Sequence, residues 1–406
     1  MRNKIYVVGT GPGNPEQLTI AARGVIDSAG LVVAAKRHMP LAGGGRVIPL
    51  GKFGETFDIV DRELDKVSVA ILVSGDTGVY SLLPLIKRRF PDEDISVLPG
   101  ISSLQSLCAA VRETWIDAKI TSGHGRDITE AHVLDAADRN AKTIFFCGPE
   151  WTPQRVCAAL AENGLGGLTV TVGEHLSYPE QRVMTGSPEE LAKTDFDDLS
   201  IMLIKNPEPW HMPASRPHDE DFIRTKVPMT REVVRGAILD ALRLEGDSVV
   251  WDLGAGTGSV TVAAALVCDG GRVCAVERNP EAVGLINANC AKFHRHNVSV
   301  TLGDSLECMA RLPKPTHVFI GGSGSELPEL LERISALGGG IRTVVSAVAF
   351  KTYSAAFDGL SGSGYADFSA CSVSVGNSKK IGSTHIMTAN NPVTIFSAVT
   401  AQKEGI

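Results

Sequence analysis

Short apolar runs alternate with amphipathic stretches along nearly the whole chain. Runs rich in β-branched residues and bounded by Gly, Pro or Asn predict strands, whereas apolar residues three and four positions apart predict helices. Their alternation is typical of an α/β protein with parallel sheets joined by helical crossovers. In the first half the predicted strands are 5–8, 31–34, 69–74, 95–98, 143–147, 169–173 and 201–204.

The second half has the same alternation with clearer helix boundaries. Thr230 is expected to cap a helix, and Asn279 to cap another whose first position is Pro280. The runs 368–375 and 394–399 have no helix between them, so an antiparallel hairpin at the sheet edge is expected. The Thr230 helix should bury Val233, Val234, Ala237, Ile238, Ala241 and Leu242. The predicted strands are 248–253, 272–277, 298–302, 317–320 and 343–348.

The alternation breaks at 206–218, where prolines are too dense for a helix interior or a central strand. A chain of 406 residues is also too long for one ordinary core. We therefore expect a domain over 1–206, a proline-rich linker over 207–223 and a second domain over 224–406, with Trp210 packed on a domain surface.

Composition narrows the class of protein. The chain is 43% hydrophobic and 21% charged, as in soluble globular proteins, and its net charge of −7 argues against a nucleic-acid partner. No apolar stretch has membrane-spanning length, and the start resembles no signal peptide, so a cytoplasmic protein without a membrane partner is expected. The eight cysteines form no C-x-x-C pair, which favours buried thiols over disulfides or a metal site.

The most informative motif is a glycine loop after strand 248–253. Gly254, Gly256 and Gly258 alternate at the point where a helix follows the strand, and Glu277 ends the next strand. Glycines let a ligand approach bare backbone, and an acid about twenty residues on is placed to accept hydrogen bonds from ribose hydroxyls. The loop predicts a nucleoside site; the plainer alternative is a turn that only packs strand against helix.

The spacing bears on which nucleoside binds. Dinucleotide sites use G-x-G-x-x-G, whereas this loop reads G-x-G-x-G with Asp252 two residues before the first glycine. A carboxylate there favours a ligand with an ammonium group over a pyrophosphate. S-adenosylmethionine fits, with Asp252, Gly254, Gly256 and Gly258 at its methionine end and Thr257 as a further cofactor-binding residue. Glu277 is assigned to the ribose, and Asp304 either to the adenine amine or to a helix cap.

The first half carries four glycine loops of its own: 9–15, 74–78 and 99–103 lie at the ends of strands given above, and 122–126 follows another short strand. Any one of these loops alone would be interpreted as a turn. The first loop also lacks the Gly-Lys-Ser/Thr sequence that binds phosphate in P-loops. Because open α/β sheets bind ligands at the carboxyl ends of their strands, four such loops predict a cleft.

The loops G-x-G-P-G, S-G-D-x-G, P-G-I-S-S and S-x-H-G-R resemble those of the tetrapyrrole (precorrin) methylases. The stretch 173–182 resembles the member acting on precorrin-6, and the second half resembles the decarboxylating precorrin methyltransferases through 224–231, 252–258, 276–280 and 319–324. The resemblance covers nearly the whole chain, in the order of the fused C5,15-methylating enzymes. One departure is Thr77, where many relatives carry proline.

The resemblance implies a two-lobed tetrapyrrole-methylase fold followed by a seven-stranded, Rossmann-like class I methyltransferase fold. It also implies S-adenosylmethionine sites in both domains, methylation of precorrin-6B at carbons 5 and 15, and loss of the ring C acetate as CO₂. The product would be precorrin-8X of cobalamin biosynthesis, and a homo-oligomer is expected. Methyl transfer to an electron-rich ring needs positioning more than acid–base groups, so no metal is expected.

By the same resemblance, cofactor and substrate residues can be assigned in the first domain. Gly11 and Pro12 should face the tetrapyrrole, and His124 and Arg126 should flank the cleft as catalytic candidates, although a structural role for His124 stays open. The expected cofactor pocket consists of Gly75, Asp76, Gly78, Ser102 and Ser103.

An acidic substrate needs cations in the second domain. Lys226 and Arg231 are the catalytic candidates and Arg342 the substrate-binding one, each weighed against a solvated surface charge, while His317 is read as packing. Rival functions are an NAD-dependent dehydrogenase, a base- or amide-methylating enzyme, an enzyme for cobalt-precorrin, and an S-adenosyl-ligand sensor with one inactive domain. The amide-methylating class commonly has N/D-P-P-Y/F where this chain has 321–324.

Overall fold

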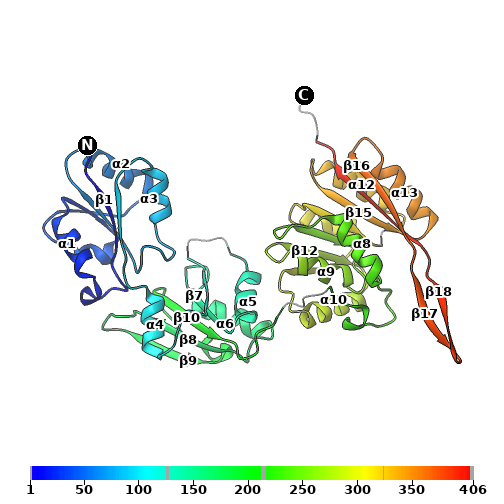
Figure 1. Ribbon diagram of the computed structural model, residues 1–406, viewed down its shortest axis with the longest axis horizontal. Coiled ribbons are helices and arrows are strands. Elements are labelled where there is room, and N and C mark those ends of the chain that lie inside the picture. The colour runs from blue at the N-terminus through cyan, green and yellow to red at the C-terminus, as the bar shows by residue number, and fades with distance from the viewer. Residues whose placement is uncertain (1, 125–127, 212–215, 323, 403–406) are drawn as a thin grey trace. The chain divides into compact units, whose positions relative to one another are not determined.

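The computed structural model describes residues 2–124, 128–211, 216–322 and 324–402. Its chain divides into two compact units, Met1–Trp210 and His211–Ile406 (Figure 1). Each unit has its own sheets and hydrophobic core. The Trp210 backbone N–H donates to the Asp138 carbonyl, and the Arg139 guanidinium lies 5.8 Å from the centre of the Trp210 ring. Trp210 therefore packs on the surface of unit 1, as expected.

The first sheet of unit 1 has five parallel strands in the order β3-β2-β4-β1-β5. Its central strands β2 and β4 are buried along their whole length, which explains their uninterrupted apolar sequences. The strands are β1 Ile5–Gly9, β2 Leu31–Ala34, β3 Arg46–Pro49, β4 Val69–Val73 and β5 Ile95–Leu98. The helices are η1 Pro15–Gln17, α1 Ile20–Ser28, η2 Lys36–Leu41, α2 Phe53–Glu63 and α3 Leu83–Arg89.

The second sheet of unit 1 is mostly antiparallel, and here the expectation of parallel crossovers was wrong. Its order is β6-β7-β10-β8-β9, and of its pairs only β6 and β7 run parallel within the described chain. Two short strands, β3 and β9, had not been predicted because both lie at sheet edges and are only partly buried. The elements are α4 Ser103–Val111, β6 Lys119–Ser122, α5 Glu130–Asp138, β7 Lys142–Phe146, α6 Pro153–Glu162, β8 Thr169–Glu174, β9 Arg182–Gly186, α7 Pro188–Leu191 and β10 Ser200–Lys205.

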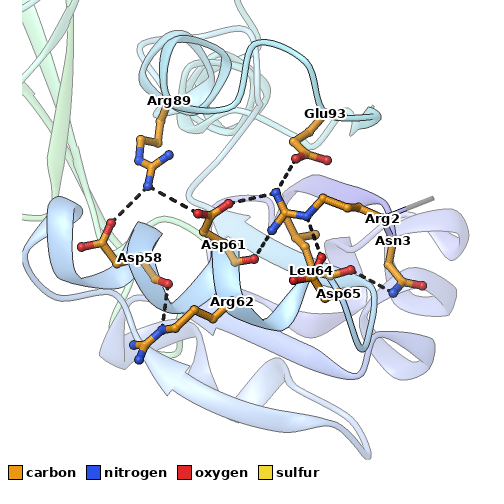
Figure 2. A network of polar contacts seen from close by, with 9 residues as sticks. All are labelled: Arg2, Asn3, Asp58, Asp61, Arg62, Leu64, Asp65, Arg89 and Glu93. Carbon is orange, nitrogen blue, oxygen red and sulfur yellow. Dashed lines mark hydrogen bonds and ion pairs between the residues drawn. The ribbon is translucent and has the colours of Figure 1, made fainter.

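A charged network at the amino-terminal edge of the first sheet ties the start of the chain to α2 (Figure 2). The Arg2 guanidinium reaches the carboxylates of Asp61, Asp65 and Glu93, at 3.0, 3.0 and 2.6 Å. Arg89 of α3 contacts Asp61 from the other side. These pairs lie opposite the glycine loops, so the network fixes the sheet rather than the site.

Unit 2 contains a seven-stranded sheet in the order β13-β12-β11-β14-β15-β19-β16, the predicted Rossmann-like class I methyltransferase arrangement. The first five strands run parallel, and β19 runs antiparallel to both neighbours. Strand order reverses between β11 and β14, the point where open α/β sheets bind ligands. The strands are β11 Val249–Leu253, β12 Arg272–Glu277, β13 Val298–Leu302, β14 His317–Ile320, β15 Arg342–Ala347, β16 Tyr365–Val373 and β19 Val393–Thr400. The helices are η3 Asp219–Asp221, α8 Glu232–Leu242, α9 Ser259–Val267, α10 Pro280–Lys292, α11 Ser305–Cys308, η4 Met309–Arg311, α12 Leu327–Ala336 and α13 Phe350–Leu360.

The last two sheet strands pair antiparallel at the edge as expected, but they are not joined by a simple turn. A two-stranded ribbon, β17 Gly376–Ile381 and β18 Thr384–Ala389, projects between β16 and β19 (Figure 1). Every residue of both ribbon strands is exposed. Because neither ribbon face is buried, the ribbon has no apolar alternation from which it could have been predicted.

Helix α8 begins one residue later than expected, with Arg231 rather than Thr230 at its cap. Val233, expected in the core, is 58% exposed, whereas Arg235 is buried. Arg235 is accommodated because its guanidinium donates to the carbonyls of Pro217 and Thr230 and pairs with Asp219 at 3.1 Å. The polar side chain thus occupies a face that periodicity alone assigns to apolar residues.

All eight cysteines are free, and seven are buried. The predicted interior position of the thiols is confirmed except at Cys371, which is exposed on β16. Across the described ranges, no helix has the length and hydrophobicity needed to cross a membrane.

Candidate functional site: a glycine-loop cavity and a cleft of loops

A cavity of about 810 Å³ opens at the carboxyl ends of the parallel strands of unit 2. Its walls come from the loops after β11, β12, β13 and β14, where the strand order reverses. At one end lie the glycine loop, Glu277 and Asp304. The other end is formed by Ser346, Val348, Ala349, Thr352, Asn390, Asn391 and Val393. A cavity of this size accommodates a nucleoside ligand with room for part of a second molecule.

The glycine loop is shaped by close backbone packing. Gly254 has φ +76°, and a Cβ at this position would meet the Gly322 carbonyl oxygen at 2.4 Å. Glycine is therefore required here by both conformation and space. The tight turn leaves Gly254, Ala255 and Gly256 lining the cavity with backbone.

Glu277 lines the cavity and holds the loop in shape. Its Oε2 accepts the backbone N–H of Gly256 at 2.8 Å, and its Oε1 accepts that of Asn279 at 3.0 Å. The carboxylate thus spans the loop after β11 and the start of α10. Each oxygen has a further lone pair for a ribose hydroxyl.

Asp252 lies beneath the loop, and the structure does not bring it to the cavity wall as expected. The side chain is 1% exposed, and its Oδ2 accepts the Thr261 hydroxyl at 2.5 Å. Burial raises the pKa of Asp252 to about 7, while the Thr261 hydrogen bond opposes the shift. Thr257 does line the cavity, and its buried hydroxyl has no partner among the described residues.

Asp304 lies at the cavity and also caps α11, with its Oδ1 accepting the Leu306 N–H at 2.8 Å. The helix-cap alternative is thus realised, and the second oxygen is available to a ligand.

The three cations predicted for the substrate lie in different places. Arg231 lines the cavity and pairs with Asp219 at 3.5 Å. Lys226 is exposed outside the lining. Arg342 begins β15, whereas Ser346 near the other end of this strand lines the cavity, so the structure does not bring Arg342 to the cavity as expected. His317, read as packing, also begins its strand and lies at this far end.

In unit 1 three of the predicted loops meet backbone to backbone at the carboxyl edge of the first sheet. Gly11 and Gly75 form a two-residue bridge, with N–H to carbonyl distances of 3.2 and 2.9 Å. A Cβ on Gly100 would meet the Gly75 carbonyl oxygen at 2.3 Å. Asp76 joins the second and third loops, because its carboxylate accepts the N–H groups of Gly78 at 2.7 Å and Gly100 at 3.1 Å.

The other predicted residues of unit 1 lie around this junction or beyond it. Ser102 is buried and caps α4, whose first residue is Ser103. Pro12 follows Gly11 in the first loop, and His124 is exposed after β6. Arg126 and Ser323, each within a predicted motif, lie outside the residues that the structure describes.

The stretch 173–182 meets the first loop directly. A Cβ on Gly13 would lie 2.2 Å from the Tyr178 ring, and the Asn14 N–H donates to the Ser177 hydroxyl at 3.0 Å. His175 and Ser177 both have positive φ, at 45° and 72°, an unusual conformation for non-glycine residues. The stretch 173–182 therefore forms a tight loop that packs against the first glycine loop, whose Gly11 and Pro12 are expected to face the tetrapyrrole.

Several cavity and cleft residues had no sequence signal strong enough to predict them. Glu326 and Asn391 line the cavity of unit 2, but they lie in loops without a repeated pattern. Arg37 and His38 lie next to the Ser74 loop of unit 1, in a 3-10 helix that had not been predicted. The run K-R-H shortly after a buried strand was the only sequence signal from which these two residues could have been predicted.

Comparison with known proteins identifies both units. The family model for tetrapyrrole (corrin/porphyrin) methylases matches residues 4–192, and the model for the precorrin methyltransferase domain matches 221–400. The precorrin-6Y C(5,15)-methyltransferase [decarboxylating] of Sinorhizobium sp. is 27% identical over 85% of this chain and 84% of that protein.

Two shorter relatives each correspond to about half of the chain. The probable cobalt-precorrin-6B C(15)-methyltransferase (decarboxylating) of Pyrobaculum aerophilum is 35% identical over 44% of this chain and 93% of that protein. The probable cobalt-precorrin-7 C(5)-methyltransferase of Methanocaldococcus jannaschii is 31% identical over 50% of this chain and 99% of that protein. The chain therefore belongs to the decarboxylating precorrin-6Y C5,15-methyltransferases, in which a tetrapyrrole methylase and a precorrin methyltransferase domain are fused.

Proposed function

We propose that the chain methylates precorrin-6B at carbons 5 and 15 and removes the ring C acetate as CO₂, giving precorrin-8X. Unit 1 methylates carbon 5, and unit 2 methylates carbon 15 and decarboxylates. This division is supported by the two shorter relatives, one named for carbon 5 and the other for carbon 15 with decarboxylation. The main support for this proposal is that both family models match the same chain, the tetrapyrrole methylase model first and the precorrin methyltransferase model second.

Each unit is proposed to bind one S-adenosylmethionine, which supplies an activated methyl group. In unit 2 the fit rests on the Gly254 turn, which a Cβ would fill, and on the buried, unpartnered Thr257 hydroxyl. Gly254, Gly256 and Gly258 admit the methionine end, Glu277 takes the ribose and Asp304 the adenine side. Asp252 acts indirectly, by supporting the loop through α9.

In unit 1 the cofactor is proposed to lie on the junction of Gly75, Asp76, Gly78, Ser102 and Ser103. Gly11 and Pro12 face the tetrapyrrole, and His124 and Arg126 keep their proposed place beside the cleft. Since Asp76 is already engaged by two backbone N–H groups, its contribution is to hold two loops together while backbone groups contact the ligand.

Decarboxylation breaks the bond between the acetate methylene and its carboxylate, and the electron pair enters the conjugated ring. A proton must then replace CO₂. Three carboxyl groups line the cavity within the described chain: Glu277 and Asp304 accept backbone N–H groups, and Glu326 has no partner there. We assign delivery of that proton to Glu326, with water restoring it, and we keep Arg231 as the cation facing the substrate.

The remaining expectations are retained as proposals: domain limits of 1–206 and 224–406 around a linker, a cytoplasmic location and a homo-oligomer. The ring is proposed to be free of cobalt, as in the names of relatives that match along the fused length. A cobalt-precorrin substrate is the second candidate, because both shorter relatives carry cobalt in their names.

The test is mass spectrometry of precorrin-6B incubated with the full chain and methyl-labelled S-adenosylmethionine. Two labelled methyl groups gained and one carboxyl group lost are expected. Glu277→Ala should cost one of two S-adenosylhomocysteine sites in calorimetric titration, because it removes the ribose acceptor and the support of Gly256. A wild-type chain that binds S-adenosylhomocysteine but transfers no methyl group to cobalt-free or cobalt-containing precorrin would contradict the proposed enzymatic activity. That result would favour an S-adenosyl-ligand sensor.

A further inference from the structure

A polar cluster outside the predicted motifs lies at the ligand edge of unit 1. It consists of Arg37 and His38 in η2, which follows β2, and Ser74, which follows β4. Since β2 and β4 are parallel neighbours, their carboxyl ends emerge side by side. Ser74 directly precedes Gly75, which pairs with Gly11. The cluster therefore borders the junction proposed to hold cofactor and tetrapyrrole.

The three side chains form a closed set of hydrogen bonds. The Arg37 Nε donates to His38 Nε2 at 3.1 Å, and its Nη2 donates to the Ser74 hydroxyl at 2.7 Å. His38 Nε2 and Ser74 Oγ lie 2.9 Å apart. Because a guanidinium nitrogen only donates, His38 Nε2 accepts from Arg37, which requires a neutral imidazole with its proton on Nδ1. The Ser74 hydroxyl lies within hydrogen-bond distance of the same nitrogen.

The surroundings keep this imidazole neutral. His38 is 1% exposed, and its Nδ1 has no partner among the described atoms. Burial and the adjacent Arg37 charge lower the pKa of His38 to about 4. A neutral, buried imidazole is a fixed acceptor, so His38 sets the direction of the exposed guanidinium.

Arg37 retains unused binding capacity. A guanidinium has five N–H donors, and the cluster uses two of them. Within the part of the chain that the structure describes, Arg37 forms no ion pair with a carboxylate. Its nearest acid in the loop, Asp76, is engaged by backbone N–H groups. An exposed cation oriented by neutral groups at a ligand-binding edge is suited to an incoming anion.

We propose that Arg37 and Ser74, oriented by His38, form a subsite for a side-chain carboxylate of the tetrapyrrole. The assignment rests on the proposed function and names a substrate contact of the carbon-5 site. The chain is acidic overall, with a net charge of −7, so a local cation is needed to hold an acidic macrocycle. Arg37 is the binding residue, and His38 is a positioning residue.

The test uses the full chain, precorrin-6B and labelled S-adenosylmethionine, with each methyl addition followed separately. Arg37→Met should raise KM for carbon-5 methylation about 10- to 100-fold, the range for losing charged hydrogen bonds. Carbon-15 methylation and CO₂ loss should stay unchanged. Arg88→Met, which removes an exposed arginine from α3, is the matched control and should behave as wild type.

His38 variants separate positioning from folding. His38→Leu removes the acceptor for Arg37 and should raise KM for carbon 5 with little change in kcat, whereas His38→Gln retains an acceptor and should recover most of the affinity. If His38→Leu fails to fold, the exposed Arg37→Met still decides the question.

Two results would overturn the subsite. One is an unchanged carbon-5 KM in Arg37→Met; the other is weaker S-adenosylhomocysteine binding in unit 1, which would mean that Arg37 holds the cofactor's own carboxylate. Both are read against an active wild type. A wild-type chain that adds no methyl to carbon 5 would instead remove the proposed function itself.

Discussion

At the residue scale, the site of unit 2 depends on two carboxyl groups in contrasting environments. Glu277 accepts two backbone N–H groups at the cavity wall, whereas Asp252 is sealed below the loop with one oxygen unpartnered in the described structure. Burying a carboxylate without enough donors disfavours its charged form. The neutral form of Asp252 is thus the one that the fold accommodates.

This environment predicts a pH dependence of stability. The pKa of Asp252 rises from 3.8 to about 7 in the folded chain, so the folded state holds its proton when the unfolded state has lost it. The free energy of unfolding should therefore fall as pH rises between these values and level off above them. For the wild type, the free energy of unfolding should fall by about 3 kcal/mol between pH 5 and pH 8. Asp252→Asn, which mimics the neutral form, should not show this fall.

Urea unfolding at the two pH values measures this difference. Asp247→Asn, at an exposed position of the same unit, is the control and should follow the wild type. Parallel pH profiles for wild type and Asp252→Asn would show that the buried carboxyl group carries no such penalty.

Individual residues were also where sequence reasoning was least complete. The motif spacing predicted Glu277 and the glycines at the cavity, because a loop between strand and helix has few possible geometries. It placed Asp252 beside the ligand, whereas the side chain points into the interior. The sequence did not reveal that Arg342 lies away from the cavity, because a charge at a strand start and a charge at a strand end look alike in sequence.

At the scale of elements, the loop junction of unit 1 has almost no spare volume. Gly100→Ala would place a methyl group against the Gly75 carbonyl, a rigid neighbour that cannot move aside cheaply. We expect a loss of about 1–3 kcal/mol in stability and loss of S-adenosylhomocysteine binding in unit 1, with the unit 2 site intact. Thermal unfolding and calorimetric titration measure both effects.

The control for this substitution is Gly54→Ala in α2, where an added Cβ meets nothing within 4 Å. It should leave both ligand sites unchanged and should not lower the stability, since the added methyl group meets no neighbour and alanine favours the helical conformation. Normal binding in Gly100→Ala would show that the loops do not need their close approach.

Elements were predictable where burial imposed a pattern. The strands β2, β5, β12, β13 and β14 have the expected limits, because apolar or β-branched runs bounded by turns leave little choice, even for β5 and β13 at sheet edges. The edge strands β3 and β9 and the ribbon β17–β18 lacked such runs. The antiparallel second sheet of unit 1 was missed because pairing direction depends on tertiary packing, which local periodicity does not encode.

At the scale of the whole molecule, the chain consists of two compact units, each with its own core. We predict that residues 1–210 and 211–406, produced as separate proteins, will each fold and bind one S-adenosylhomocysteine. The mixture should still add both methyl groups. Circular dichroism, titration and product mass would check this, and aggregation of either half alone would mean that the fused chain is needed for folding.

The distribution of thiols has a practical consequence. Burial raises the pKa of Cys290 to about 12 and of Cys157 to about 12, and the other interior thiols are equally shielded from solvent. Cys371 alone among the eight faces solvent. A maleimide fluorophore added to the native protein will attach at this strand, giving a single optical probe in the carboxyl-terminal unit without any engineering of the sequence.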